Sequence, residues 1–378
     1  MFHKYSLLLL FFIFSQAHTF SIDKALCPVN LNAAVIHTSE KSDLKKFFSP
    51  DRLLINQETT IVTNPLELQK LARDTLFYIN RYEQAHKHVI SPTHFDRDIL
   101  PLQRVKSTLR TLISLIEEDK NNGTPFRILN QTFLKKHFGC IKWTGDATTA
   151  RKKNELCVKD GKIRLTHYAV FQCSGSYNKT KEHTHALYKL LSHKNYLPYT
   201  KQQVLKGILN KKENKKKVRP LVWLSREALE EALMQGTIFV TMPDGKKRIF
   251  NVDISNDIDY NKNIKNMRNQ KRYWYFREIA SHLASDLLKR FSRRKNIVFA
   301  GDIYSIGIGK LIAISYQNQL TKQEELRLGI LADTGGAFLR NLYQLDSFAG
   351  IFASRQELKK QTRFFPDTVN SYILYKRS

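Results

Sequence analysis

Two aspartates near the C-terminus are the residues best suited to chemistry. Asp333 ends an apolar run, and the glycines that follow it, Gly335 and Gly336, allow a backbone to approach a ligand closely. Asp346 lies 13 residues further on, between apolar neighbours. Burial there would raise the pKa of a carboxyl group and let it hold a proton near neutral pH, as a general acid must. One aspartate alone is more often a turn or capping residue, but two in one strand-rich unit favour an acid–base site.

The rest of the chain predicts the elements that must position this pair. Apolar side chains recur at three- to four-residue spacing in residues 65–118, which predicts two amphipathic helices. From residue 162 onward short strands predominate. Helices are predicted in that part at 199–209, 225–232 and 277–291. After residue 296 only strands and turns are expected, with strands at 297–300, 311–315 and 328–332.

One hairpin is predicted from its turn. Residues 238–242 and 247–252 are rich in β-branched and aromatic side chains, and Pro243, Asp244 and Gly245 stand between them.

The chain has 378 residues, of which 42% are hydrophobic and 25% charged, values typical of a folded globular protein. That length is enough for two domains or for one domain with an insertion.

The N-terminus has the features of a secretory signal peptide. Basic residues precede an apolar run at 7–14, and the small residues Ser15 and Ala17 favour cleavage after Ala17. An uncleaved membrane anchor is the weaker alternative, because the run is shorter than the roughly 20 apolar residues of a spanning helix. The sequence therefore predicts an exported protein of the periplasm or cell envelope.

Four cysteines, Cys27, Cys140, Cys157 and Cys173, lie in the first half of the chain. In an oxidising compartment they allow up to two disulfides in three pairings, and Cys140 with Cys157 is the nearest pair. Zinc binding is the alternative, but no Cys-x-x-Cys spacing occurs. Leu26 before Cys27 is too bulky for lipoprotein processing, so lipidation is not expected.

The charge balance predicts anionic partners. The chain has 62 lysines and arginines against 34 acidic residues, a formal net charge of +28. Nucleic acid, an anionic membrane face and an acidic polymer such as peptidoglycan all fit this charge, and export excludes nucleic acid as the main partner. Peripheral association with an anionic membrane stays open. The lysine-rich run at 211–217 is predicted to be a solvated loop.

Two further patterns each allow a functional and a structural interpretation. His183 and His185 suggest a metal site, but no acidic or thiol partner is near in sequence, which favours a solvated loop. The aromatic run at 273–276 suggests a platform for sugar rings, although such residues at the entry of a helix are more often core. No metal ligand set is predicted.

Four short motifs occur in a fixed order from about residue 65 to the end. The run Asp333-Thr334-Gly335-Gly336-Ala337 precedes Asp346-Ser347-Phe348-Ala349-Gly350. Earlier come a strand ending in Thr166-His167-Tyr168, a Leu197-Pro198 helix start, and Gln235-Gly236 followed by the Asp-Gly turn. In this order the motifs resemble the membrane-bound lytic murein transglycosylase A (MltA) family with its C-terminal triple-aspartate domain.

The resemblance implies a fold that is mainly β with N-terminal helices. It consists of a double-psi β-barrel built from both ends of the chain and an inserted second β-domain. Residues 1–17 would be the signal peptide, 18–165 the helices and first part of the barrel, 166–292 the inserted domain, and 293–378 the rest of the barrel.

The resemblance also implies an activity that needs no metal or cofactor. Family enzymes cut the bond between N-acetylmuramic acid and N-acetylglucosamine in peptidoglycan glycan strands and leave a 1,6-anhydro ring. Asp346 would act as acid and then base, and Asp333 would shape and polarise the site. The implied substrate contacts are Thr166, Tyr168, Gln235, Gly236, Gly335, Gly336 and Ala337.

The chain departs from the family pattern at several positions. Ser315 matches the family's first aspartate, His167 replaces a glycine, and Ile238 replaces the last glycine of a Gln-Gly-Ser-Gly strand. These departures keep the proposed acid but favour altered substrate contacts. A catalytically inactive peptidoglycan-binding or envelope scaffold protein on the same fold is therefore the alternative. A third hypothesis, a basic envelope protein unrelated to glycan, requires the two aspartates to lie apart.

Overall fold

The computed structural model describes residues 44–377, except 54, 57, 153–157, 159, 193–196, 259–260, 262, 265, 280, 336–337 and 339–340. The predicted signal peptide, Cys27, Cys157, Gly336 and Ala337 lie outside the described residues. The helices are α2 (Pro65–Tyr82), α3 (Lys87–Ile90), α4 (Thr93–Asp98), α5 (Leu102–Asn121), α6 (Gln131–His137), α7 (Ala147–Lys152), α8 (Lys201–Leu205), α9 (Lys212–Lys215), α10 (Arg226–Gln235), α11 (Ala284–Arg293), α12 (Ile303–Ile306) and α13 (Arg355–Thr362). Short 3₁₀ turns cover Leu44–Lys46, Arg127–Leu129, Ile208–Asn210, Met267–Asn269 and Ser281–Leu283.

The strands form one large mixed sheet and one small sheet. The strands are β1 (Phe48–Asp51), β2 (Thr60–Ile61), β3 (Phe138–Trp143), β4 (Ile163–Ser174), β5 (His185–Leu190), β6 (Val218–Leu224), β7 (Thr237–Thr241), β8 (Lys247–Ser255), β9 (Trp274–Ile279), β10 (Val298–Ala300), β11 (Leu311–Gln317), β12 (Glu324–Asp333), β13 (Gln344–Phe352) and β14 (Thr368–Lys376). The large sheet has 12 strands, and β5 and β6 pair separately. The chain is thus a mixed α/β protein.

Strand pairing closes a ring within the large sheet. The strands β14, β11, β12, β10, β13 and β4 pair in that order, and β4 pairs back to β14. The ring joins β4, from the middle of the chain, to the five C-terminal strands β10 to β14. Its double-psi form stays a prediction.

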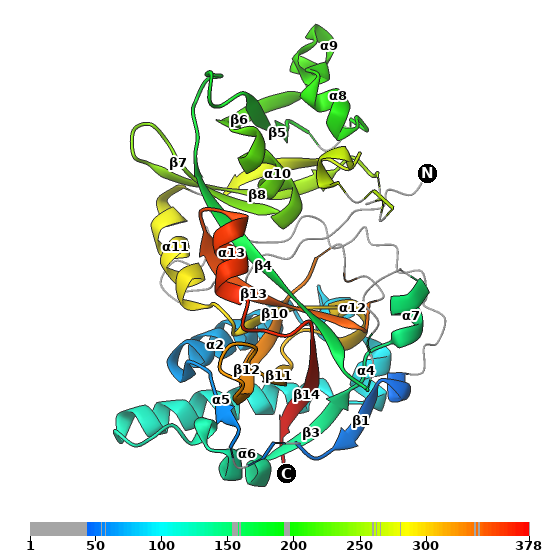
Figure 1. Ribbon diagram of the computed structural model, residues 1–378, viewed down its shortest axis with the longest axis vertical. Helices are drawn as coiled ribbons and strands as arrows, with labels where there is room; N and C mark the ends of the chain where they lie inside the picture. The colour runs from blue at the N-terminus through cyan, green and yellow to red at the C-terminus, as the bar shows by residue number, and fades with distance from the viewer. Residues whose placement is uncertain are drawn as a thin grey trace.

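β4 connects the two halves of the molecule. Figure 1 shows this long strand running from the sheet at the bottom to the elements around β7, β8 and α10 at the top. Its first part pairs with β13 and its last part with β7. The N-terminal helices α2 and α5 pack beside the lower sheet, where they bury the apolar stripe that predicted them.

Local signals account for the predicted elements that the structure confirms. Asn64 caps α2 by accepting a hydrogen bond from the Glu67 amide at 3.1 Å, and Pro65 follows at the first helical position. The hairpin of β7 and β8 turns at Gly245, whose φ of 78° suits a residue without Cβ. These elements depend on residues close in sequence, which is why the sequence predicted them.

The helix predicted at 277–291 was wrong in its first part. Arg277 to Ile279 belong to β9 and pair with Asn251 to Ile249 of β8, and α11 begins only at Ala284. Pairing with a neighbouring strand satisfies the backbone groups that a helix would otherwise bond internally. The aromatic run at 273–276 is buried on and beside this strand, which confirms the core interpretation.

Two other predictions of irregular structure were also wrong. The C-terminal part contains α12 and α13, although only strands and turns were expected there. Ser354 accepts from the Glu357 amide, and Glu357 accepts from the Ala353 amide, so a capping motif in the sequence was overlooked. The lysine-rich run at 211–217 contains the helical turn α9, although its lysines are largely exposed as expected.

The cysteines that the structure describes are not paired. Cys140 on β3 is buried with a free thiol, and Cys173 on β4 is also free. The sequence left the pairing of the four cysteines open, and the free thiols of Cys140 and Cys173 correct the expectation that they could form disulfides. Cys140 faces apolar neighbours of the core, where burial raises the pKa of its thiol to about 12. No helix among the described residues is long and apolar enough to cross a membrane.

Candidate active site

Four neighbouring strands place both aspartates in one row. Ala300 of β10 lies beside Asp333 of β12 on one side and beside Asp346 of β13 on the other. Asp346 in turn lies beside Thr166 of β4. Adjacent strands are about 4.8 Å apart, so the two aspartate backbones are separated by two strand spacings, roughly 10 Å. We call Asp333, Ala300, Asp346 and Thr166 the carboxylate row.

Asp333 is the enclosed member of the row, with 4% of its surface exposed. The Tyr168 hydroxyl donates a hydrogen bond to its Oδ2 at 2.8 Å, and the Thr334 amide donates to its Oδ1 at 2.8 Å. Burial, with a smaller contribution from the nearby Asp346 carboxylate, raises the pKa of Asp333 to about 8 despite these two hydrogen bonds. Asp333 therefore holds a proton at neutral pH.

Asp346 is the accessible member of the row. It is partly exposed, and its Oδ1 accepts a hydrogen bond from Gln344 Nε2 at 3.1 Å. Desolvation raises the pKa of Asp346 to about 6, while Gln344 and the positive charge of Arg164 oppose the rise. A carboxyl group with a pKa near the working pH can both donate and accept a proton, as acid–base catalysis requires.

A hydrogen-bonded frame holds these groups in place. Gln344 Nε2 also donates to Thr166 Oγ1 at 2.8 Å, which links β13 to β4 beside Asp346. Thr334 Oγ1 donates to the Gly301 carbonyl at 2.7 Å, which fixes the chain directly after Asp333. The row is therefore set by contacts between strands that are far apart in sequence.

Asp302 anchors the segment between the two aspartates. It is fully buried, and its Oδ2 accepts hydrogen bonds from the Asn341 amide at 3.1 Å and from Ser305 Oγ at 2.7 Å. Its Oδ1 accepts from the Ser305 amide, which caps α12. Neither Asp302 nor Gln344 was predicted from the sequence as a site residue. The spacing of Asp302 and Ser305 was a capping signal that could have drawn attention to Asp302.

Comparison with known proteins gives a match to solved structures alone: no family model and no curated protein matches this chain. Escherichia coli MltA with bound chitohexaose superposes with a TM-score of 0.56 at 13% sequence identity, over 88% of this chain and 95% of that one. The membrane-bound lytic murein transglycosylase of Agrobacterium tumefaciens superposes with a TM-score of 0.55 at 13% sequence identity, over 87% of this chain and 98% of that one. The chain has the MltA fold. The expected structural resemblance is thereby confirmed over nearly the whole described chain.

Within this MltA fold, Ser315 does not lie in the carboxylate row. It sits on β11 between Leu326 of β12 and Asn370 of β14. Asp302 instead follows Ala300, the central residue of the row, by two positions.

The predicted substrate contacts fall into three groups. Thr166 and Tyr168 lie at the carboxylate row, as described above. Gln235 accepts a hydrogen bond from the Ala169 amide at 3.2 Å, so it lies against β4 one residue beyond Tyr168. Gly236 ends α10 with a φ of 81°, a structural reason for glycine that requires no ligand. Gly335 lies in the turn after Asp333, bonded to Phe338.

The two histidines for which a metal site was the less favoured interpretation, His183 and His185, have hydroxyl partners. His183 Nε2 is hydrogen-bonded to Ser174 Oγ at 3.1 Å, and His185 Nδ1 to Thr184 Oγ1 at 2.7 Å. The described residues contain no group of three or more His, Cys, Asp and Glu side chains arranged to hold a metal ion.

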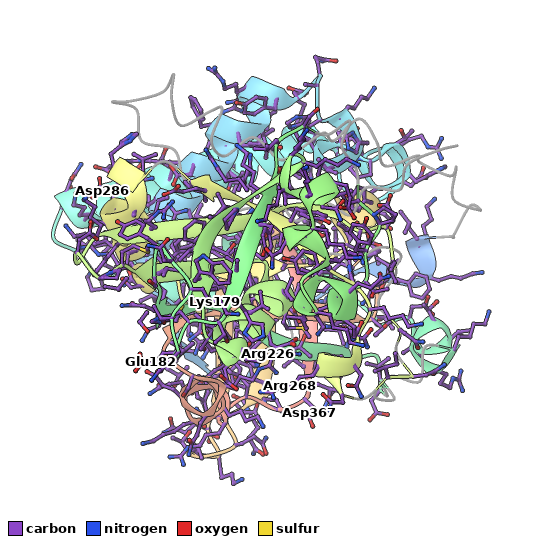
Figure 2. The ribbon with its side chains drawn as sticks, turned by 90° about the horizontal axis from the view of Figure 1, so that it is seen from above. Lys179, Glu182, Arg226, Arg268, Asp286 and Asp367 are labelled. Atoms are coloured by element: carbon purple, nitrogen blue, oxygen red, sulfur yellow. The ribbon has the colours of Figure 1, made fainter. Side chains whose placement is uncertain are left out.

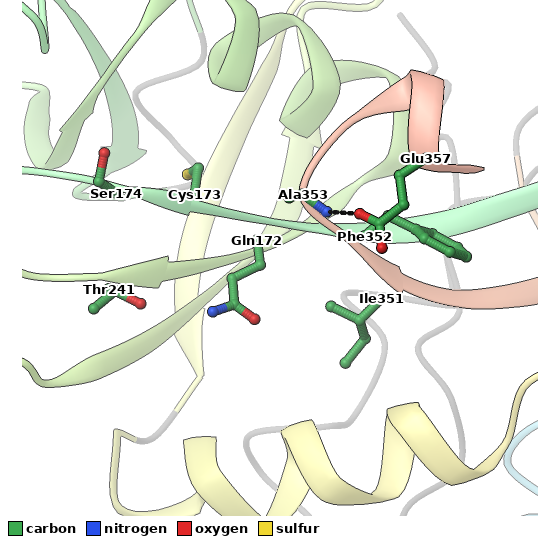
Figure 3. Close-up of a pocket in the computed structure, with 8 residues that line it drawn as sticks. All are labelled: Gln172, Cys173, Ser174, Thr241, Ile351, Phe352, Ala353 and Glu357. Atoms are coloured by element: carbon green, nitrogen blue, oxygen red, sulfur yellow. Dashed lines mark hydrogen bonds between the residues drawn. The ribbon is translucent and has the colours of Figure 1, made fainter. Parts of the chain in front are cut away.

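A hollow of about 510 Å³ opens further along β4, where the pairing of β4 passes from β13 to β7 (Figure 3). Its lining residues are Gln172, Cys173, Ser174, Thr241, Ile351, Phe352, Ala353 and Glu357. Gln172 is six positions beyond Thr166, a distance of roughly 20 Å along an extended strand. The hollow therefore does not include the carboxylate row, and within it Glu357 binds the Ala353 amide at 2.9 Å.

Proposed function

We propose that this protein is an exported lytic transglycosylase that cleaves the glycan strands of peptidoglycan in the periplasm or cell envelope. The observation that carries the proposal is the carboxylate row on an MltA fold: a partly exposed Asp346 with a raised pKa beside a buried, protonated Asp333. The E. coli neighbour binds chitohexaose, an oligomer of N-acetylglucosamine, which supports a glycan as the ligand.

In the proposed reaction Asp346 acts first as an acid. Its proton passes to the oxygen between N-acetylmuramic acid and N-acetylglucosamine, and the C1–O bond breaks as the leaving sugar takes that oxygen with the proton. Positive charge develops at C1 of the muramic ring, which the new Asp346 carboxylate stabilises electrostatically.

Asp346 then acts as a base. The carboxylate removes the proton of the muramic C6 hydroxyl, and O6 forms a bond to C1 of the same sugar. The product is the 1,6-anhydro ring, no water is consumed, and Asp346 is again protonated. One carboxyl group is sufficient because the nucleophile belongs to the substrate, whereas ordinary glycosidases need two carboxyl groups.

Asp333 supports this cycle by remaining protonated. A second negative charge near Asp346 would raise the pKa of Asp346 further and weaken it as an acid. The bond from Tyr168 orients Asp333, and we assign Thr166, Tyr168 and Gln235 to contacts along β4 with the strand of sugars. We further propose that the six-strand ring is a double-psi β-barrel, with residues 166–292 as the inserted domain.

The proposal is tested by digesting purified sacculi and identifying the products by mass spectrometry. The wild type should release anhydromuropeptides, and Asp346→Asn should lower the rate by about 10²- to 10⁴-fold, the usual contribution of a general acid–base group. Asp367→Asn is the matched control, because Asp367 is exposed at the surface (Figure 2).

Equal rates for wild type and Asp346→Asn would contradict the assignment of the acid. If neither protein releases anhydromuropeptides but both bind sacculi, the protein is the catalytically inactive peptidoglycan-binding protein considered above.

A further inference from the structure

Basic side chains gather at one end of the molecule, away from the carboxylate row. They lie on β5, in the turn after α8, on and beside α9, and on β6, which Figure 1 shows at the upper end. The residues of this basic tip are Lys189, Lys206, Lys211, Lys212, Lys215, Lys216, Lys217 and Arg219. Glu213 is the only acidic residue between positions 185 and 219. Figure 2 looks down on this end of the molecule.

The charges of the basic tip are not neutralised within the protein. None of its eight side chains forms an ion pair with a described residue, and all are exposed or partly exposed. The acidic residues of neighbouring α10 are committed elsewhere: Glu230 pairs with Lys201 and Arg226, and Glu227 pairs with Arg268. The tip therefore presents a net positive field to whatever lies outside it.

The backbone that carries these charges is ordered by its own small core. Asn214 of α9 is buried, and its side chain donates to the Ile208 carbonyl at 2.8 Å. Tyr188 donates to Asn210 Oδ1 at 3.1 Å. These contacts pin the lysine-rich turn onto a cluster of buried apolar residues that includes Leu190 and Leu209. The lysines are thus held on one fixed surface and not on a free tail.

An exposed leucine adjoins the basic tip. Leu191 follows β5 with 52% of its surface exposed, and its amide donates to the Lys217 carbonyl at 2.9 Å. A soluble polyanion offers no apolar region that an exposed leucine could enter. A bilayer does, because apolar side chains enter the boundary between headgroups and acyl chains while neighbouring lysines contact the headgroups.

We propose that the basic tip docks this protein on a bilayer surface rich in anionic lipid, with Leu191 entering the headgroup region. The attraction depends on the lysines and on screening, since the field of a charged membrane falls off within a Debye length of about 8 to 10 Å. The proposal goes beyond glycan cleavage and does not rest on it, because no residue of the tip belongs to the carboxylate row.

The test uses the full chain and lipid vesicles in a co-sedimentation assay. Vesicles with about 30% phosphatidylglycerol should bind the protein, and pure phosphatidylcholine vesicles should bind it at least tenfold less. Replacing Lys211, Lys212, Lys215 and Lys216 together by Gln should lower the partition coefficient at least tenfold, and Leu191→Ser should lower it about threefold.

The matched control removes four lysines from other exposed surfaces. Lys289→Gln, Lys295→Gln, Lys359→Gln and Lys360→Gln together change the net charge equally, and this variant should bind within about twofold of wild type. Circular dichroism of both variants establishes that they are folded.

Three results would overturn the proposal. One is equal binding to neutral and anionic vesicles, or none to either. Another is an equal loss in the control variant, which would make net charge the cause. The third is that Leu191→Ser binds vesicles normally while the tip lysines are needed equally for binding polyglutamate, which would identify an anionic polymer as the partner. Digestion of sacculi without vesicles should proceed normally in every tip variant, which separates this proposal from the proposed reaction.

Discussion

The carboxylate row and the basic tip use charge in opposite ways. Asp333 is enclosed in the large sheet with the Tyr168 hydroxyl and the Thr334 amide as partners, and its pKa is raised to about 8. The lysines of α9 lie exposed on a short surface helix, without ion pairs to described residues. Enclosing an ionisable group shifts its pKa and couples its protonation to folding and to any reaction at the site. An exposed charged side chain can be substituted with little change in folding free energy.

The largest expected effect on stability comes from removing the buried Asp302 side chain. Asp302→Ala leaves the Asn341 and Ser305 amides without their acceptor in a buried region. The free energy of unfolding should fall by about 2 to 4 kcal/mol, because buried unsatisfied donors are costly. Urea denaturation followed by circular dichroism measures this, with exposed Asp367→Ala as the control. A loss below about 0.5 kcal/mol would mean that Asp302 does not anchor the segment.

The second effect is a pH dependence of stability that belongs to Asp333. Its pKa is about 8 in the folded protein and about 3.9 in an unfolded chain. Between these values the unfolded carboxyl group is ionised while the folded one keeps its proton, so stability should fall as pH rises from about 4 to 8. One such group contributes up to about 1.4 kcal/mol per pH unit.

Asp333→Asn should remove this contribution, since an amide does not titrate. Melting temperatures of wild type and variant between pH 4.5 and 8.5 provide the measurement. The difference between the two proteins should shift in favour of Asn at higher pH. Parallel curves would show that Asp333 is already ionised in the folded state.

The smallest effect on stability is expected at the exposed lysines of the basic tip. The four Lys→Gln changes on α9 and beside it should alter the free energy of unfolding by less than about 0.5 kcal/mol, because these side chains have no buried partners. Chemical denaturation at physiological salt checks this. A loss above about 1 kcal/mol would indicate that the tip lysines have structural partners, and the contrast with the carboxylate row would fail.

Much of the fold could be predicted where the signal lies within a few residues. Helix α2 follows from its apolar spacing and its Asn64 cap, and the β7–β8 hairpin follows from the Asp-Gly turn. The predictions failed where pairing with a strand distant in sequence determines the local conformation. Residues 277–279 have a helical pattern but pair with β8, and no local rule reveals that partner.

The candidate site, like the fold, could be predicted from the sequence only in part. The sequence by itself determined the types of residue proposed to do the chemistry, because Asp333 and Asp346 stand out in their motifs and their apolar surroundings. Only the tertiary structure decided that Ala300 lies between them, that Tyr168 bonds Asp333, and that the basic tip forms one surface. The physical reason is that pKa values and binding surfaces depend on distances through space, and those distances arise from pairing between segments far apart in the chain.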